Sequence, residues 1–257
     1  MGDLGWRAGT VHGQARGAQV RVAIGSAFRN SAGGHLQRYF HQVDALRDLL
    51  KEHGHSLRVI AVEGDSVDNT RTELMRWAEY CVLALTIVTR NHGKRVFGST
   101  EEPERMAALS YVGNGILESV LPEDDVLIYV ESDLVWRAET MLSLINKLGF
   151  PEVQPMGGEV RTIDAISPLV FAGEAFYDIW AFRKSGHRFG PFKPYHGELL
   201  FDRATPVDST GSCIVMRGEV ARTCRIIDNE ALVGFGRDVW AKGFALFADA
   251  RERIDHP

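Results

Sequence analysis

Short apolar runs and amphipathic stretches alternate along the first half of the chain. The β-branched runs at residues 20–28 and 57–63 are typical of strands buried in a parallel sheet. Between them, apolar side chains recur at steps of three and four residues, which predicts a helix over residues 35–53 with one buried face. This succession of strand, helix and strand predicts right-handed crossovers and a mainly parallel central sheet flanked by helices.

The same reasoning predicts the remaining elements. In the first half we expect a helix that ends near residue 79, a strand at 82–88, a polar loop at 89–100, a helix at 101–120 and a strand at 125–133. The pattern is looser afterwards, where we expect helices at 138–148 and 218–224, an irregular stretch at 151–168, and strands at 169–172, 212–216 and 244–248. The glycines at 234 and 236 predict a turn that opens a short helix.

Composition narrows the class of protein. With 257 residues, 45% of them hydrophobic, the chain can form one large α/β domain, which we assign to residues 19–257 behind a Gly-rich flexible tail at 1–18. A net charge of −5 argues against a basic polyelectrolyte binder but leaves a local basic patch open. The three cysteines lack metal-ligand spacing and indicate a reducing, cytoplasmic compartment. No apolar run of about 18 residues occurs, so no integral membrane segment is expected.

The strand expected at 125–133 ends in two acids one residue apart, Glu131 and Asp133. Because side chains alternate along a strand, both carboxylates point the same way. Carboxylates in this arrangement can hold Mn²⁺ or Mg²⁺, hard cations that also bind diphosphate oxygens. Ligands usually bind at the carboxyl edge of an open α/β sheet, although a solvated loop after a core strand would also contain acids.

These features together resemble a glycosyltransferase of the GT-A fold, a Rossmann-like single α/β domain, over nearly the whole chain. Five local motifs carry the resemblance: the turn at 63–70, the helix segment at 105–114, the acid-x-acid motif at 131–133, the later acidic motif at 236–238 and His256 near the end of the chain. Glu63 and Glu131 stand where the family usually has Asp, and Arg237 where it usually has Glu. The octapeptide at 176–183 is most similar to fungal capsule-associated mannosyltransferases.

The resemblance implies a nucleotide-sugar-binding half at 19–135 and an acceptor half at 136–257. Ser26 and Arg29 belong to the segment at the end of the first strand. There they are expected to contact the base or a phosphate of a UDP- or GDP-sugar. Glu63, at the end of the second strand, could accept hydrogen bonds from the base or ribose, or be a surface acid.

Three basic residues, Arg90, Lys94 and Arg105, are candidates to offset the charge of the donor diphosphate. A solvated basic face would explain any one of them equally well.

The resemblance also implies roles for four residues of the metal and catalytic centre. Asp133 is expected to ligate the metal directly, Glu131 to bind it through water or to bind the ribose, and His256 to supply a further ligand. Asp238 could take the proton of the acceptor hydroxyl if the reaction inverts the anomeric configuration, and the same position suits an N-cap. The capsule-associated branch is of the retaining type, in which Asp238 would orient the acceptor or the sugar, so the sequence leaves the stereochemistry open.

An aromatic segment is the candidate acceptor or sugar wall, since aromatic faces stack on sugar rings and polar side chains bind hydroxyls. Its residues are Tyr177, Asp178, Trp180 and Arg183, and the alternative is a packed helix with Trp180 in the core. The loop at 185–198 mixes basic and aromatic residues, as a lid or a contact for a polyanionic acceptor would. A glycan, a lipid-linked sugar and a hydroxymethylated DNA base all remain possible acceptors.

Two other classes of function stay open. A nucleotidyltransferase would also use a nucleotide and a divalent metal, but it normally has a Gly-rich basic loop after the first strand, which residues 26–30 lack. A non-catalytic carbohydrate- or nucleic-acid-binding module would not need Asp133, Asp238 and His256 together.

Overall fold

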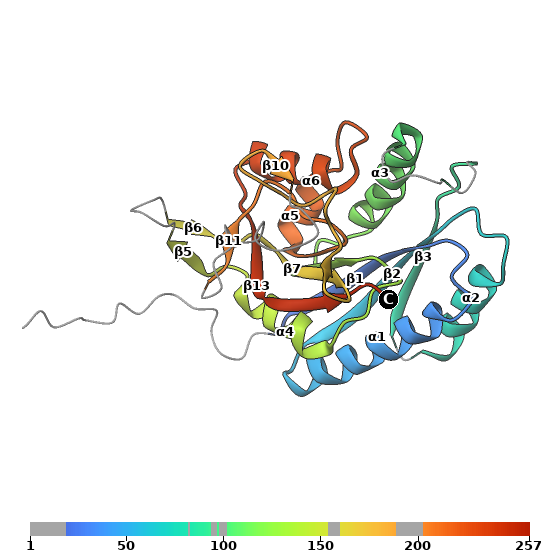
Figure 1. Cartoon of the computed structure of the whole chain (residues 1–257). Coiled ribbons are helices and arrows are strands. Elements are labelled where there is room, and N and C mark those ends of the chain that lie inside the picture. Colours follow the sequence, from blue (N-terminus) through green and yellow to red (C-terminus); the bar gives the residue numbers. More distant parts are fainter. Residues whose placement is uncertain (1–18, 82, 94–96, 98–101, 154–159, 189–202) are drawn as a thin grey trace, which may run out of the picture.

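The computed structural model describes residues 19–81, 83–93, 97, 102–153, 160–188 and 203–257 (Figure 1). The first half contains β1 (Arg21–Phe28), α1 (His35–Glu52), β2 (Ser56–Glu63), α2 (Thr70–Tyr80), β3 (Ala84–Thr89), α3 (Pro103–Glu118) and β4 (Val126–Val130). All seven elements were predicted, and β4 ends before Glu131, so both acids of the pair lie just beyond the strand.

The second half is built from shorter pieces. They are α4 (Ala138–Lys147), β5 (Pro151–Val153), β6 (Val160–Thr162), β7 (Ala165–Ala172), β8 (Ala175–Phe176), β9 (Arg183–Lys184), β10 (His187–Arg188), β11 (Thr205–Pro206), β12 (Cys213–Arg217), α5 (Gly218–Thr223), α6 (Ala231–Ala241) and β13 (Leu246–Asp255).

One mixed sheet joins the two halves, in the order β11-β13-β7-β12-β4-β1-β2-β3, with β8 paired to β7. The strands β4, β1, β2 and β3 are parallel to one another, as predicted, and β7 is parallel to β13. Strand β12 runs antiparallel to both β4 and β7. The sheet is therefore continuous from the predicted nucleotide half into the predicted acceptor half.

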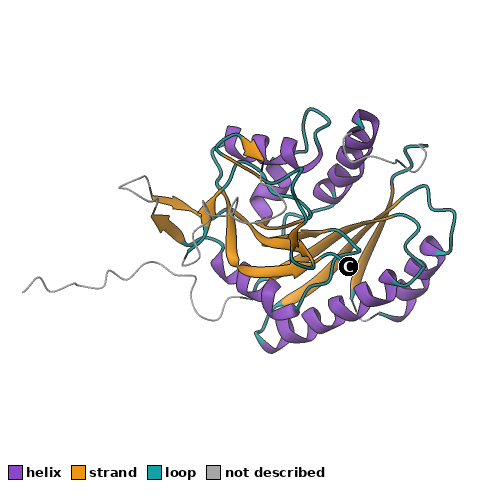
Figure 2. Ribbon diagram, in the orientation of Figure 1, coloured by secondary structure: helices purple, strands orange, loops and turns teal. Residues whose placement is uncertain are grey.

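Helices cover both faces of the sheet: α1, α2 and α4 lie on one side, and α3, α5 and α6 on the other (Figures 1 and 2). Alternate residues of β1 supply the two cores, with Val22 and Ile24 in one and Ala23 in the other. Gly25 follows the same alternation, and a Cβ there would overlap the side chain of Ile116 on α3. This glycine therefore lets α3 lie close against the sheet.

The expected irregular stretch at 151–168 is wrong in part, because β5, β6 and the beginning of β7 lie within it. Pro168 made the strand hard to foresee, since proline cannot donate to a sheet ladder. Here Pro168 pairs with Asp249 where the register of β13 shifts, so the missing N–H falls beside a bulge.

The expected turn at 234–238 is also wrong, because these residues lie inside α6. The glycines serve packing instead: a Cβ at Gly234 would overlap the carbonyl of Ile227, and one at Gly236 would overlap the carbonyl of Asp208. Among the described residues, no helix combines the length and apolar character needed to cross a membrane.

Candidate active site

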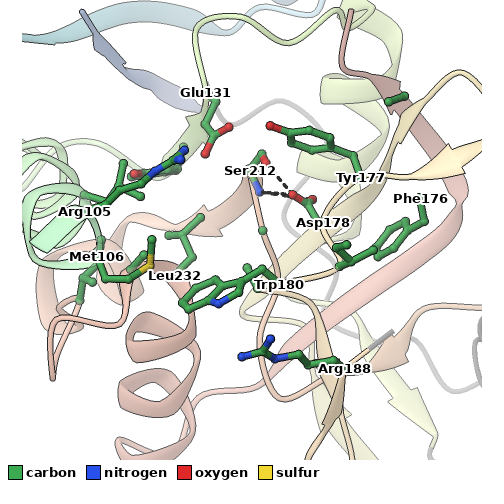
Figure 3. Close-up of a pocket in the computed structure, with 18 of the residues that line it drawn as sticks. Arg105, Met106, Glu131, Phe176, Tyr177, Asp178, Trp180, Arg188, Ser212 and Leu232 are labelled. Atoms are coloured by element: carbon green, nitrogen blue, oxygen red, sulfur yellow. Dashed lines mark hydrogen bonds between the residues drawn. The ribbon is translucent and has the colours of Figure 1, made fainter. Parts of the chain in front are cut away.

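A pocket of about 690 Å³ lies beyond the carboxyl end of β4 (Figure 3). Three parts of the chain form most of its wall: the first turn of α3, the segment from Ala175 to Ala181, and the residues at the beginnings of β12 and α6. Of the predicted site residues, the described structure brings these into the lining: Arg105, Glu131, Tyr177, Asp178 and Trp180.

Glu131 reaches the pocket directly after β4, and its backbone N–H donates to the carbonyl of Ser212 at 2.9 Å. Loss of hydration, reinforced by the carboxylates of Asp133 and Asp178, raises the pKa of Glu131 to about 8. The side chain of Ser212 and then Arg105 of α3, which extends toward Glu131, lower this pKa in part (Figure 3). The carboxylates of Asp133 and Asp178 therefore act in the same direction as burial and disfavour the ionised form of Glu131.

Asp178 is 6% exposed and lies in the turn after β8. Its carboxylate accepts a hydrogen bond of 2.6 Å from the hydroxyl of Ser212 and longer bonds of 3.3 Å from the Ser212 N–H. A Cβ at Gly211 would overlap this carboxylate, so glycine is needed beside it. Burial raises the pKa of Asp178 to about 6, against the opposing effects of Ser212 and His256.

Asp133 and His256 meet at the edge of this region, with 3.5 Å between Oδ2 and Nε2. Backbone hydrogen bonds of 2.7 and 2.9 Å between Val135 and Asp255 join the loop after β4 to the end of β13. The ring of Tyr177 stacks on the imidazole of His256, with centroids 3.9 Å apart and planes at 14°. The backbone pairing therefore brings Asp133 and His256 together, and the stacking with Tyr177 orients the imidazole.

The Asp133–His256 pair is chemically suited to a divalent cation, because carboxylate oxygen suits Mg²⁺ and Mn²⁺ and imidazole is acceptable to Mn²⁺. Within the described parts of the chain, no three His, Cys, Asp or Glu residues are grouped closely enough to enclose an ion. The protein would then supply two ligands and leave the other positions to phosphate oxygens and water, as is usual for Mg²⁺.

The aromatic segment forms a wall, not a helix, because none of residues 177–182 is helical. Trp180 lines the pocket and is partly exposed, so the alternative of a packed helix with a core tryptophan is wrong. The guanidinium groups of Arg183 and Arg188 lie 5.9 and 5.7 Å from the centre of its ring. Arg188 lines the pocket, whereas Arg183 is not part of the lining.

The candidates at the ends of β1 and β2 differ in accessibility. Ser26 is fully buried within β1 and exposes no surface to a ligand, contrary to its expected role. Arg29 lies beyond the strand, with Nη1 3.4 Å from Nε2 of His92. Glu63 is 3% exposed and accepts a hydrogen bond of 3.2 Å from Arg71, so it is not a surface acid. Neither Arg29 nor Glu63 lines the pocket.

Lys94 lies outside the described residues, as does the greater part of the expected loop at 185–198.

Asp238 does not have the position that the sequence suggested. It lies in the second half of α6, not at its beginning, so the expected N-cap geometry is wrong. Its carboxylate accepts hydrogen bonds from the backbone of Arg225 at 2.7 Å and from Nζ of Lys242 at 2.8 Å. The pocket is lined instead by the beginning of α6, Ala231 and Leu232. The structure therefore does not bring Asp238 together with Glu131.

Sequence reasoning missed three residues that support the site. Arg38 and Gln42 of α1 donate to the carbonyls of Asp133 and Leu134 at 2.7 and 3.1 Å, and Ser212 holds Asp178. Arg38 and Gln42 are four residues apart, a spacing that places two polar side chains on one helix face. That spacing could have suggested a common contact, but not its partner.

No protein-family model and no curated protein matches this chain. Several solved structures match it. Staphylococcus aureus TarS 1–349 is 12% identical with a TM-score of 0.52, and its complex with UDP is 10% identical with the same TM-score. The match covers 92% of this chain and 60% of TarS 1–349. The catalytic domain of Drosophila β1,4-galactosyltransferase 7, in complex with xylobiose, is 10% identical with a TM-score of 0.40, covering 92% of this chain and 70% of that one.

The likeness to TarS defines the fold. The chain has a mixed α/β domain whose mostly parallel central sheet is flanked by helices, and this architecture matches glycosyltransferases of the GT-A type. The predicted fold class is confirmed. The chain spans about 60% of the length of TarS 1–349, and identities of 10–12% extend the likeness to the fold alone.

Proposed function

We propose that the protein is a metal-dependent glycosyltransferase that moves a sugar from a nucleoside-diphosphate sugar to a hydroxyl group. The observation that carries this proposal is the meeting of Asp133 with His256 beside a pocket lined by Glu131 and Arg105, at the carboxyl end of a central strand. Carboxylates, an imidazole and a guanidinium in this arrangement suit a cation and a diphosphate together.

The residues divide the binding of the donor between them. Asp133 and His256 would hold Mn²⁺ or Mg²⁺, which supplies Lewis-acid stabilisation of the charge that develops on the departing diphosphate. Arg105 adds a fixed positive charge on the opposite wall and can form two parallel hydrogen bonds to a phosphate. Glu131 would bind the ribose or a water ligand of the cation.

Two indications bear on the identity of the donor base, and they point to different nucleotides. The TarS structure that shares the fold was determined with UDP, which favours a UDP-sugar. The octapeptide at 176–183, similar to fungal capsule-associated mannosyltransferases, favours GDP-mannose instead. Arg29 and Glu63, at the carboxyl ends of β1 and β2, would be the nearest groups of the sheet edge to the base or ribose. We therefore place UDP-sugars before GDP-sugars and test both classes. Comparing hexose and pentose derivatives in the same assay shows which kind of sugar is transferred.

The acceptor is a molecule with a sugar-like or flat ring. Tyr177 and Trp180 line the pocket, and aromatic rings can stack on sugar rings and on nucleobases. Glycans, lipid-linked sugars and hydroxymethylated DNA bases all satisfy this requirement, and the acceptor panel of the assay includes one of each.

The test is the release of nucleoside diphosphate from UDP- and GDP-sugars, with and without Mn²⁺. We expect release from one donor, at least about tenfold faster with Mn²⁺, and loss of that release in Asp133→Ala. Asp48→Ala is the matched control, because Asp48 is an exposed aspartate of α1. Formation of pyrophosphate from a nucleoside triphosphate and a sugar phosphate would indicate a nucleotidyltransferase instead. Turnover of no donor, with ligand binding unaffected by Asp133→Ala, would indicate a binding module.

A further inference from the structure

Two carboxylates line the described part of the pocket, Glu131 and Asp178. They come from different segments, with Glu131 after β4 beside the proposed metal pair and Asp178 in the aromatic segment, and Ser212 lies between them (Figure 3). A transferase that inverts the sugar needs a base on the acceptor side, separate from the groups that bind the diphosphate. The segment that carries each acid therefore distinguishes the two.

The wall formed by α6 contributes no acid to the pocket. Its first two residues, Ala231 and Leu232, face the cavity, and Ile226 precedes them in the lining. Asp238 lies two turns further along the helix, and Arg225 and Lys242 occupy its carboxylate. The residue that the sequence suggested as the base is thus committed to contacts within the fold.

Asp178 has the geometry of a preorganised base. The Ser212 hydroxyl donates to Oδ1 at 2.6 Å, whereas the hydrogen bond that Oδ2 accepts from the Ser212 N–H is 3.3 Å long. Packing against Gly211 fixes the carboxylate in this orientation. Tyr177 and Trp180 lie on either side of Asp178 in sequence and also line the pocket, so an acceptor stacked on them would bring its hydroxyl to this wall.

We propose that Asp178 is the catalytic base of the reaction, a role that rests on the proposed function. The acceptor oxygen forms a bond to the anomeric carbon while the bond from that carbon to the diphosphate oxygen breaks. The hydroxyl proton passes to Asp178, and the electron pair of the broken bond leaves with the nucleoside diphosphate. One displacement of this kind inverts the configuration of the sugar. Ser212 is a positioning residue, because it acts on the substrate through Asp178.

The stereochemical test uses the wild-type protein and needs no variant. UDP-glucose, or whichever α-linked nucleotide sugar is turned over, is incubated with water as the acceptor, and the free sugar is followed by proton NMR before it equilibrates. The β-anomer is expected first. Release of the α-anomer would overturn the assignment of Asp178 as a base.

The kinetic test compares two aspartates with the same substitution. Asp178→Asn keeps the size of the side chain and should lower kcat about 100-fold or more, since general bases contribute roughly 10²–10⁴-fold. Its Mn²⁺-dependent affinity for UDP should stay within about twofold of wild type. Asp238→Asn should keep most of kcat, because its carboxylate contacts the protein rather than the pocket.

Retention of more than a tenth of kcat in Asp178→Asn, or an equal loss in Asp238→Asn, would overturn the inference. If Asp178→Asn fails to bind UDP, Ser212→Ala is tested in its place. We then expect kcat to fall while the KM for the donor stays unchanged. An unchanged kcat would contradict the inference. Wild-type protein that turns over no nucleotide sugar would overturn the proposed function itself, so the two failures are distinguishable.

Discussion

At the scale of single residues, the pocket depends on carboxylates kept close together by small neighbours. Asp178 and Glu131 are both destabilised as anions, and burial is the largest cause of the raised pKa of each. Their proximity is possible because Gly211 leaves room for the Asp178 carboxylate and Ser212 donates to it. A bound cation or a hydrogen-bond donor would stabilise the ionised form of these two carboxylates.

The first prediction concerns Gly211. In Gly211→Ala the new Cβ overlaps the carboxylate of Asp178, so the side chain must rotate away from Ser212. We expect a loss of about 1–3 kcal/mol in the free energy of unfolding and a fall in kcat of at least about tenfold. Gly33→Ala is the matched control, because nothing lies within 4 Å of a Cβ there and its backbone is not in the left-handed region. Equal stability and activity in both variants would contradict the packing described for Asp178.

Acidic residues show how far sequence reasoning reaches at this scale. The spacing of Glu131 and Asp133 at the end of an apolar run was enough to predict two acids at the carboxyl end of a central strand, although the strand ends at Val130 and both acids lie just beyond it. Asp238 was different, because the direction of a helical side chain depends on where the helix begins. The sequence suggested a beginning near Gly236, whereas α6 begins at Ala231, which turns Asp238 toward Lys242. No local sequence pattern shows which of these two positions begins the helix.

At the scale of elements, α1 holds the loop that carries Asp133. Arg38 donates to the Asp133 carbonyl, and Gln42 both donates to the carbonyl of Leu134 and accepts from the N–H of Trp136, at 3.1 and 3.3 Å. The loop is joined on its other side to β13, through Val135. A helix from the first half and a strand from the end of the chain thus position one proposed metal ligand.

Gln42 provides the second prediction. Gln42→Ala removes both hydrogen bonds to the loop and should lower the free energy of unfolding by about 1–2 kcal/mol. It should also weaken Mn²⁺-dependent UDP binding several-fold, because the Asp133 backbone becomes less constrained. Calorimetric titration checks the binding and urea unfolding checks the stability. The control is Gln37→Ala on the same helix, where Gln37 makes one exposed contact with Glu73. If the two variants bind UDP with Mn²⁺ equally well, the loop is not positioned by α1.

The elements of the first half were predictable because each one depends on its own apolar pattern. Strands β1 and β2 are buried runs, and α1 has a continuous apolar face. The second half depends on pairing between distant segments. Residues 151–153 become a strand only by pairing with 160–162, and Pro168 is accommodated only by the bulge in β13. Contacts of this kind leave little trace in a local sequence window.

At the scale of the whole molecule, β13 ties the two helical layers and the proposed metal site to the sheet. Near its bulge, Asp249 is fully buried and pairs with Lys147 of α4 at 2.9 Å and with Arg251 at 2.6 Å. Burial alone would raise the pKa of Asp249, but the hydrogen bonds from Arg251 and Lys147 outweigh it and hold the pKa below its ordinary value. The strand that leads to His256 is therefore anchored by an ionised carboxylate.

The third prediction is the pH dependence of this anchor. Because the folded pKa of Asp249 is depressed, its contribution to stability is complete above the unfolded value of about 3.9 and is lost as the pH falls through the folded value. Asp249→Asn should therefore be less stable than wild type by about 1–3 kcal/mol at pH 7, with the difference shrinking below about pH 4. Urea unfolding between pH 3 and pH 7 measures it. Asp228→Asn, at an exposed aspartate, should show no such narrowing. A difference that grows on acidification would contradict the assignment.

The most direct test of the central claim is a thermal-shift panel of nucleoside diphosphates, with and without Mn²⁺, on wild type and Asp133→Ala. A ligand at about 100 times its Kd stabilises the folded state by roughly 2.7 kcal/mol, a shift that is easily measured. We predict that UDP or GDP raises the Tm only when Mn²⁺ is present, and that Asp133→Ala abolishes the increase. A nucleotide shift that is independent of Mn²⁺ and survives in Asp133→Ala, or no shift with any nucleotide, would contradict a metal-bound diphosphate at Asp133 and His256.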